Sequence, residues 1–478
     1  GSRSAAPRAW PAKGGDGGRV PSEAVRPVRL VLETATFAIG AVAVAVMHLY
    51  AGAVLLRDVP EQAQQSVWLA AATCALLLAS VMLAARWAVI LWLAMRGHVD
   101  RTLRPAPEPV LWPRVSVLVP AYNEQETIER ALRSLLALDY PDLEIVCVDD
   151  GSSDRTLELA RRVAAGSGPV SLRVLHQANG GKWSALNLAW RNASGELFLF
   201  VDADSHLEPD AVRWLVRTMA CSGADAVAGQ VRVRNRHRLL TLLQALEYLA
   251  CQSAVRAAQH VTGTVLVVPG PIGLYRREAL AAVRDRFGCI APDARTVAAD
   301  GPVHGDTFAE DFDLSLSVLA LGGRVVYEPR AVAHTKGPAT ALKLLNQRYR
   351  WLRGSLQVLR KFVRRTASDA GLSRPTLVVW LLATYGVDFV LTPALVGLGT
   401  AAWLCNGLPN GFGETAGLLL LAWIGTGMVT TVGFASTHRD RLGLALLEPV
   451  AVVYMSLFLR AMLPFVVLDE LRRMRMRW

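Results

Sequence analysis

The segment Leu143–Asp154, with the sequence LEIVCVDDGSSD, decides the fold class of this chain. Its apolar first half predicts a buried strand, its acidic second half predicts a loop, and Arg155–Ala165 follows with the spacing of a helix. The same order recurs around it, with further strands predicted over 115–120, 172–175 and 197–201, and further helices over 126–138 and 183–191. This repeat predicts an α/β domain whose mixed, mostly parallel sheet has helices on both faces.

Polar clusters follow three of the predicted strands. They are Tyr122-Asn123-Glu124 after the first strand, Asp149-Asp150 after the second, and Asp202-Ala203-Asp204 after the fourth. Ligands of open parallel sheets bind at the carboxyl ends of the strands, so these clusters should meet at one edge of the sheet. Carboxylates gathered there would repel one another unless a cation joined them.

The two acidic clusters allow a structural and a functional interpretation. Asp149 and Asp150 could form a strand-ending turn, with Asp154 capping the next helix; alternatively, Asp150 accepts hydrogen bonds from a bound nucleoside. Asp202 and Asp204 alternate, so both side chains project from the same face of an extended segment. Oxygen ligands of this kind suit Mg²⁺ or Mn²⁺, which would bridge Asp204 to the phosphates of a donor.

Two later segments add a cation and a carboxylate. Lys182 begins a helix behind two glycines, where it could meet a diphosphate or simply be an exposed first-turn lysine. The spacing is not that of a P-loop. Glu310 and Asp311 begin another helix, a place where the helix dipole alone favours acids. In a transferase that inverts an anomeric centre, Asp311 is the candidate base for the acceptor hydroxyl.

A basic amphipathic stretch, Leu342–Arg365, contains Gln347-Arg348-Tyr349-Arg350-Trp351. The stretch predicts a helix that lies on a membrane surface. Within it, Trp351 could stack on an acceptor sugar while Arg350 offsets the charge of a diphosphate. Together the clusters supply what sugar transfer from a nucleotide donor requires.

Five segments are apolar and about long enough to cross roughly 30 Å of hydrocarbon. They are Thr34–Leu56, Val67–Met95, Thr376–Leu404, Thr415–Ser436 and Leu442–Leu468. Arginines on the N-terminal flank and over 96–104 place both ends of the first pair, and with them the soluble domain, in the cytoplasm; the linker Arg57–Gln65 then faces outward. Five simple crossings would leave the basic tail outside, so either the last segment is re-entrant or interfacial, or one long segment comprises two elements. A cytoplasmic tail is favoured.

Four ionisable residues lie within these spans, namely Arg86, Asp388, Glu448 and Arg460. Such groups are costly in a bilayer and usually face a partner or a wet path. They therefore indicate either pairing between helices and snorkelling to the interface, or a polar conduit.

Composition supports a membrane protein with a soluble middle. The chain has 478 residues, 52% of them apolar, and a net charge of +11. Basic residues cluster beside the spans, which argues for anionic headgroups and against nucleic acid as the partner. The six cysteines lack paired spacing and predict neither disulfides nor a zinc site. The expected order is a disordered basic tail (1–28), two transmembrane helices (29–95), the soluble domain (96–337), interfacial helices (338–370), C-terminal transmembrane helices (371–468) and a basic tail (469–478).

The ordered set Asp-Asp-Gly, Asp-x-Asp, Glu-Asp and Gln-x-x-Arg-Trp between spans resembles the membrane-integrated processive family-2 glycosyltransferases. These include poly-N-acetylglucosamine, chitin, hyaluronan and cellulose synthases, and the resemblance covers about residues 113–360 plus the flanking spans. It implies a GT-A domain inserted between transmembrane helices that binds a UDP-sugar and Mg²⁺ or Mn²⁺. It further implies inversion of the anomeric centre and extrusion of a β-linked polymer.

The resemblance also implies a role for each matching residue. Tyr122, Glu124 and Asp150 would hold the nucleoside, and Lys182 and Arg350 the diphosphate. Asp202 would support the donor and the metal, and Asp204 would ligate the metal. Asp311 would be the base, with Glu310 as a second catalytic carboxylate, and Gln347 and Trp351 would hold the acceptor. Two departures stand out. Ala309 replaces the usual threonine before Glu-Asp, and Val268–Pro271 stands where relatives often have a Ser-Gly pair.

We therefore expect an inner-membrane enzyme that polymerises UDP-N-acetylglucosamine. Its partners would be the UDP-sugar, the growing polysaccharide and the bilayer, with room for accessory subunits. One alternative is a transferase that adds a single sugar to a lipid or protein, against which the Gln-x-x-Arg-Trp motif and the C-terminal spans argue. Another is a transporter or scaffold that only binds a nucleotide sugar, which would not require a base.

Overall fold

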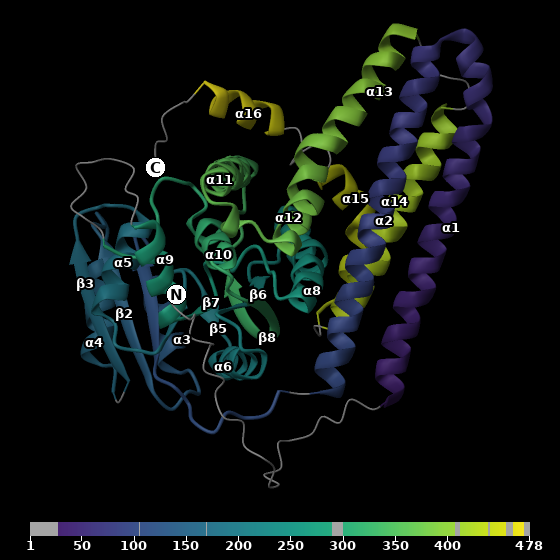
Figure 1. The fold of residues 1–478 in the computed structure, drawn as a ribbon. Helices are drawn as coiled ribbons and strands as arrows, with labels where there is room; N and C mark the ends of the chain where they lie inside the picture. The colour runs from purple at the N-terminus through teal and green to yellow at the C-terminus, as the bar shows by residue number, and fades with distance from the viewer. Residues whose placement is uncertain are drawn as a thin grey trace.

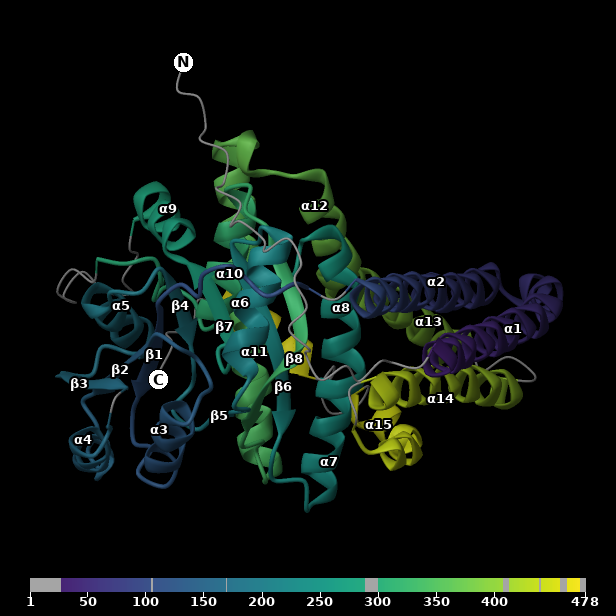
Figure 2. The same ribbon diagram turned by 90° about the horizontal axis from the view of Figure 1, so that it is seen from below.

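A computed structural model describes residues 27–104, 106–168, 170–288, 300–406, 412–437, 440–455 and 462–472. A sheet domain and a group of long apolar helices lie side by side in both views (Figures 1 and 2). The helix α2 (Val67–Leu103) joins them, because its C-terminal part packs along α8 (Ser253–Thr262). At this contact a Cβ on Gly97 would lie 3.2 Å from the Val261 side chain.

The sheet has eight strands in the order β3-β2-β1-β4-β7-β6-β8-β5. Their bounds are β1 Val115–Ala121, β2 Leu143–Asp150, β3 Ser171–Gln177, β4 Leu197–Phe200, β5 His206–Leu207, β6 Ala226–Val233, β7 Gly273–Arg276 and β8 Val325–Thr335. β1 pairs in parallel with β2 and β4, β2 with β3, and β6 with β8. The pairings of β4 with β7, β6 with β7 and β5 with β8 are antiparallel. The predicted mixed, mostly parallel sheet is confirmed.

Helices cover both faces of the sheet, and β1 shows why its sequence is apolar throughout. Val117 and Val119 belong to the core formed with α3 (Ile128–Leu136), α4 (Thr156–Ala165) and α6 (Ala211–Ser222). Leu118 points the other way, into the core shared with α5 (Lys182–Asn192), α9 (Arg277–Phe287) and α10 (Glu310–Ala320). Alternate residues of a strand face opposite sides of a sheet, so a strand buried on both sides contains few polar residues.

Four of the described helical segments are long and apolar enough to cross a membrane. The first two are Phe37–Gln64 in α1 (Pro27–Gln65) and Val67–Leu103 in α2. The third, Pro375–Cys405, runs through α12 (Pro375–Leu381), the π-helix η3 (Leu382–Leu391) and α13 (Thr392–Asn406). The fourth is Gly417–Ala435 in α14 (Phe412–Thr437). At 1.5 Å per residue, a helix of 37 or 39 residues is longer than the roughly 30 Å hydrocarbon layer. The expected linker Arg57–Gln65 is helical, and only Ser66 separates α1 from α2.

The fifth expected span, Leu442–Leu468, is not one continuous helix. Its described parts are η4 (Leu442–Leu447), α15 (Glu448–Val453) and α16 (Leu463–Leu471). Prolines stand in the first turn of both α15 and α16, where their fixed backbone angle suits the start of a helix rather than its interior. The apolar stretch Leu442–Val453 is too short to cross alone.

The apolar helices approach one another closely at glycines. A Cβ on Gly433 of α14 would lie 1.8 Å from Phe37 of α1, and a Cβ on Gly399 of α13 would lie 2.7 Å from Leu76 of α2. Small residues at such positions let helix backbones approach closely in membranes.

The stretch with Gln347 and Trp351 forms α11 (Ala341–Ser368), whose first turn is capped by the Thr340 side chain. α16 packs along α11, because Tyr349 donates to Asp469 at 2.7 Å and Arg353 pairs with Glu470 at 3.2 Å. The predicted disordered tail up to residue 26, and residues 473–478 of the basic tail, lie outside the described residues, as does Arg460.

Candidate active site

All of the site residues predicted from the sequence line one cavity of about 1290 Å³. They are Tyr122, Glu124, Asp150, Lys182, Asp202, Asp204, Glu310, Asp311, Gln347, Arg350 and Trp351. The first six come from the carboxyl ends of β1, β2 and β4 and from the start of α5, and the others come from α10 and α11. The edge of the sheet therefore meets the helix with the Gln-x-x-Arg-Trp motif across a shared space.

Asp150 has a local task that its motif did not reveal. One carboxylate oxygen accepts from Gly180 N at 2.9 Å and from Gln177 Nε2 at 2.7 Å, and the other accepts from Gly181 N at 2.9 Å. Gly181 adopts a positive φ of 90°, which favours glycine, and the next residue begins α5. Asp150 thus holds the loop that presents Lys182 to the cavity.

Lys182 lies between two carboxylates from different elements. Its Nζ is 2.7 Å from Asp202 Oδ1 and 2.8 Å from Glu310 Oε1. Burial lowers the pKa of this ammonium, but Asp202 and Glu310 outweigh that effect and raise it well above its ordinary value. Lys182 therefore stays charged and connects the Asp-x-Asp segment to the start of α10.

The negative charges of the carboxylates at the sheet edge are only partly offset by their surroundings. Burial and the charge of Asp202 raise the pKa of Asp204, whose carboxylate accepts from Ser205 at 2.9 Å and from Thr335 at 3.3 Å. Burial, and then Asp204 and Asp202, raise the pKa of Glu124, although a hydrogen bond from Thr127 lowers it. Carboxylates that resist ionisation in this way would be relieved by a divalent cation, so the donor set fits Mg²⁺ or Mn²⁺.

Glu310 and Asp311 differ in pKa although they are neighbours in sequence. Burial raises the pKa of Glu310, but the Lys182 ammonium lowers it below its usual range. Burial, and then the negative charge of Glu310, raise the pKa of Asp311 to about 6. A carboxylate with a pKa near the working pH suits proton transfer, so of these two carboxylates Asp311 has the pKa that a base would need.

The pKa of Asp311 predicts the acid side of the pH profile. A general base must be deprotonated, so kcat/KM should fall about tenfold per pH unit below about pH 6 and level off above it. The measurement is release of UDP from the expected UDP-sugar donor, at low donor concentration between pH 4.5 and 8.5. In a Glu310→Gln variant the repulsive charge is gone, so the midpoint of this fall should move to lower pH. A midpoint that stays in place would contradict the assignment.

The aromatic platform of α11 rests on a buried ion pair. Arg348 pairs with Glu247 of η1 (Glu247–Gln252) at 2.7 Å, and its guanidinium lies 4.1 Å over the Trp351 ring. Trp351 also stacks on Tyr248, with 6.3 Å between ring centroids and 29° between ring planes. Trp351 is 38% exposed, so one part of the indole is held while another part remains free to contact a ligand.

The cavity continues from the sheet edge into the apolar helices. Its wall there includes Leu76, Ser80, Arg86 and Trp87 of α2, Asp388 of η3, Val396 and Trp403 of α13, and Trp423, Thr426 and Thr430 of α14. Arg86 Nη1 and Nη2 donate to Asp388 Oδ1 and Oδ2 at 2.7 and 3.1 Å. These two residues therefore pair between helices, and both line the cavity. Glu448 also lines it and accepts from Thr431 at 2.5 Å.

The chain has clear relatives. Residues 113–354, about half of the chain, match the family described as "Glycosyltransferase like family 2". The chain belongs to this family. Its sheet domain is accordingly a GT-A-type domain, and the protein is a glycosyltransferase.

Two curated relatives act on N-acetylglucosamine by name. The chain is 30% identical over 246 residues to the poly-beta-1,6-N-acetyl-D-glucosamine synthase of Staphylococcus aureus (strain COL). The matched part is 51% of this chain and 55% of that protein. The chain is 36% identical over 252 residues to an N-acetylglucosaminyltransferase of Bradyrhizobium diazoefficiens, which covers 52% of this chain and 50% of that protein. The chain thus matches about half the length of these relatives.

A solved structure shares the fold. The mannosyltransferase PcManGT from Pyrobaculum calidifontis, in complex with GDP-Man and Mn²⁺, matches with a TM-score of 0.57 at 24% identity. The match covers 83% of this chain and 99% of that chain. At this identity the likeness shows the fold alone.

Proposed function

We propose that this glycosyltransferase is a membrane-embedded, inverting and processive polymerase of UDP-N-acetylglucosamine that moves a β-linked product across the membrane. The observation that carries the proposal is the cavity, because the same space of about 1290 Å³ touches Asp311, Trp351 and the helices α2, α13 and α14. A transferase that releases a product after one addition would not need such a continuation. The two relatives named for N-acetylglucosamine support the choice of sugar.

The residues of the site suggest how transfer proceeds. The hydroxyl oxygen of the acceptor attacks the anomeric carbon while the bond from that carbon to the UDP oxygen breaks, and the hydroxyl proton passes to Asp311. Lys182 and Arg350 would offset the negative charge that develops on the leaving diphosphate. Asp204 and Asp202 would hold Mg²⁺ or Mn²⁺, which, when bound, supplies further neutralisation of that charge. Gln347 and Trp351 would hold the acceptor sugar.

Four crossings also suggest the orientation. The chain would cross the membrane in α1 and return in α2, and it would cross again in α13 and return in α14. The GT-A domain and the segment from Leu442 onward would therefore lie on the same side of the membrane. η4 packs against α7 (Leu239–Leu246) of the GT-A part, in agreement with this arrangement. The arginines at 96–104 favour the cytoplasmic side of an inner membrane.

The first test is UDP release by purified protein in detergent, with each UDP-sugar offered singly and Mg²⁺ or Mn²⁺ present. We expect release with UDP-N-acetylglucosamine and a ladder of long products on a gel. A product lengthened by one sugar only would support single transfer instead. Binding of UDP-sugars without any release would point to a transporter or scaffold.

A bulky substitution in the cavity wall tests which path the product takes. Ser80 is buried in α2 and lines the cavity among the apolar helices. We expect Ser80→Trp to shorten the products strongly while transfer of the first sugars persists, because the added indole fills space that a growing chain needs. Ser80→Ala is the matched control and should make products of normal length. Products of unchanged length from Ser80→Trp would place the path of the chain elsewhere.

A further inference from the structure

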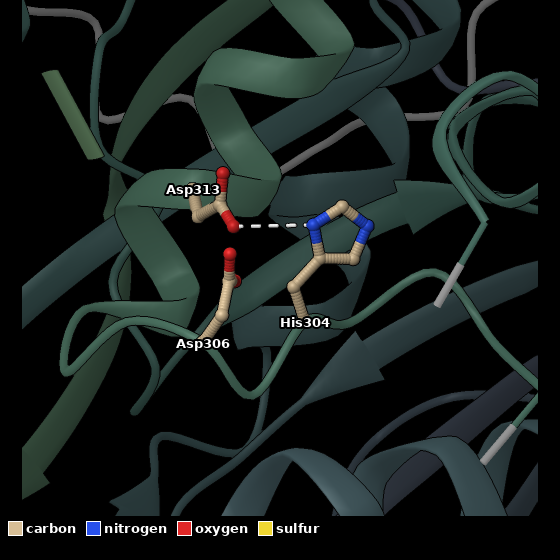
Figure 3. A group of neighbouring side chains, drawn as sticks. All are labelled: His304, Asp306 and Asp313. Atoms are coloured by element: carbon tan, nitrogen blue, oxygen red, sulfur yellow. Dashed lines mark ion pairs between the residues drawn. The ribbon is translucent and has the colours of Figure 1, made fainter. Parts of the chain in front are cut away.

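A lysine outside the cavity occupies the centre of a group with the composition of a metal site. His304, Asp306 and Asp313 point toward one another (Figure 3), and one ligand atom from each lies within 4.8 Å of the others. Among the described residues this is the one such group of three. Lys361 of α11 reaches into it, with its Nζ 2.6 Å from Asp306 Oδ1, 2.6 Å from Asp313 Oδ2 and 2.7 Å from His304 Nδ1.

The hydrogen bonds around Lys361 leave no room for an ion. An ammonium has three donors, and all three find an acceptor here. Since His304 Nδ1 accepts from Lys361, its Nε2 carries the proton and donates to the Gly288 carbonyl at 2.9 Å. Burial opposes ionisation of Asp313, but the charge of Lys361 beside it holds the pKa of this carboxyl below its usual range. Asp313 is therefore ionised at any working pH.

The group is also balanced in charge. Arg365 approaches the same side chains, with one nitrogen 3.7 Å from Asp313 Oδ1 and another 3.2 Å from His304 Nδ1. Two carboxylates thus face Lys361 and Arg365. The side chains of His304 and Asp313 are 1% and 4% exposed, so loss of Lys361 would leave an uncompensated negative charge that is largely shielded from water.

The position of the group links it to catalysis. The segment 300–309 leads directly to Glu310 and Asp311, and Asp313 lies in the first turn of the same helix. Asn187 of α5 holds this segment through both hydrogen-bonding groups of Val303, at 2.8 and 3.0 Å. On the other side, α11 holds it through Lys361 and through Gln357, which accepts from Phe308 N at 3.1 Å. α10 is thereby fixed between the helix of Lys182 and the helix of Trp351.

We propose that Lys361 is a positioning residue for glycosyl transfer, which takes the place of a cation among His304, Asp306 and Asp313 and fixes the start of α10 against α11. The inference rests on the proposed function for its kinetic consequence only. Lys361 does not line the cavity, so it acts through the position of Asp311 relative to the acceptor held by α11.

The kinetic test compares Lys361→Ala with Lys343→Ala, an exposed lysine on the same helix. We expect the first variant to lose about 10²-fold in kcat, with the KM for the donor nearly unchanged, because a small misplacement of reacting groups costs that much. Methylammonium or ethylammonium should restore part of the kcat of Lys361→Ala and should not affect Lys343→Ala. An unchanged kcat, or a loss that neither amine restores, would overturn the positioning role.

A second test does not depend on activity. Lys361→Ala should bind Co²⁺ with a visible absorption band, since an imidazole and two carboxylates then surround an open space. Co²⁺ held by Asp202 and Asp204 would absorb equally in every variant, so the parent protein, and a variant that also contains His304→Ala, should lack the additional band. If folded Lys361→Ala shows no additional band, the proposal that Lys361 takes the place of a cation is wrong. If that variant does not fold, Lys361→Met keeps the bulk of the lysine side chain without its charge and serves for the test of kcat. A parent enzyme that releases no UDP with any sugar would refute the proposed function, while the Co²⁺ result would still decide this inference.

Discussion

Replacing Asp311 with asparagine should reduce UDP release by about 10²–10⁴-fold, the usual contribution of a general base. Asparagine has nearly the same shape and can still accept the hydrogen bond that Phe312 N donates to Asp311 Oδ1 at 2.8 Å. Donor binding should therefore change by less than about twofold, because the lost interaction belongs to the transition state. Steady-state UDP release and calorimetric binding of UDP measure the two quantities.

The matched control is Asp285→Asn, which removes an exposed carboxylate from α9 on the surface of the domain. It should leave both turnover and UDP binding as they are. If Asp311→Asn retains turnover within about tenfold of the parent, the base lies elsewhere and Glu310 becomes the first carboxylate to examine.

Replacing Asp204 with asparagine should have an effect of similar size through a different cause. The Asp204 carboxylate is buried and repelled by Asp202, so a divalent cation would stabilise its ionised form. A bound metal contributes several kcal/mol to charge neutralisation, so turnover should fall by more than about 10²-fold. The concentration of Mn²⁺ needed for half-maximal activity should rise in the same variant.

The test is a Mn²⁺ titration of UDP release, accompanied by direct binding of Mn²⁺ in the presence of UDP. Asp139→Asn, an exposed carboxylate paired with Arg213, serves as the control and should titrate like the parent protein. A variant at Asp204 with the same Mn²⁺ midpoint as the parent would show that the metal is held by other residues.

Much of the site could be predicted because its residues follow strands. A strand end is recognisable in a short stretch of sequence, and the rule that parallel strands present their carboxyl ends at one edge then places Glu124, Asp150 and Asp204 together. Glu310 and Trp351 do not follow strands of this edge. Their residue types suggested a catalytic carboxylate and a platform for a sugar, but no rule of sheet geometry placed them beside these acids.

What could not be predicted depends on contacts between distant segments. The pairing of Arg86 with Asp388 joins residues 302 positions apart, and nothing near either residue specifies the other. Arg348 lies inside a recognised motif, but its partner Glu247 belongs to a separate helix. Lys361 resembles any lysine of a basic helix until the fold brings His304 and Asp313 to it.

The broken fifth span had a local signal. Pro449 and Pro464 each stand where a helix starts, and a proline inside a continuous crossing would remove a backbone hydrogen bond. The prediction counted Leu442–Leu468 as a fifth crossing because of its apolar composition, and it also left open a re-entrant or interfacial segment. Composition sums over a window and is insensitive to a single residue that interrupts the backbone pattern.

The glycine contacts among the apolar helices fix how closely these helices approach one another. Where Gly433 meets Phe37 and Gly399 meets Leu76, the glycine backbone itself forms one side of the contact, so no pair of side chains can change rotamer to open a gap. α14 is thereby held against α1, and α13 against α2, at distances set by the main chain of one partner. If the proposed polymer passes between these helices, walls of fixed spacing would admit a slender unbranched chain more readily than a branched one.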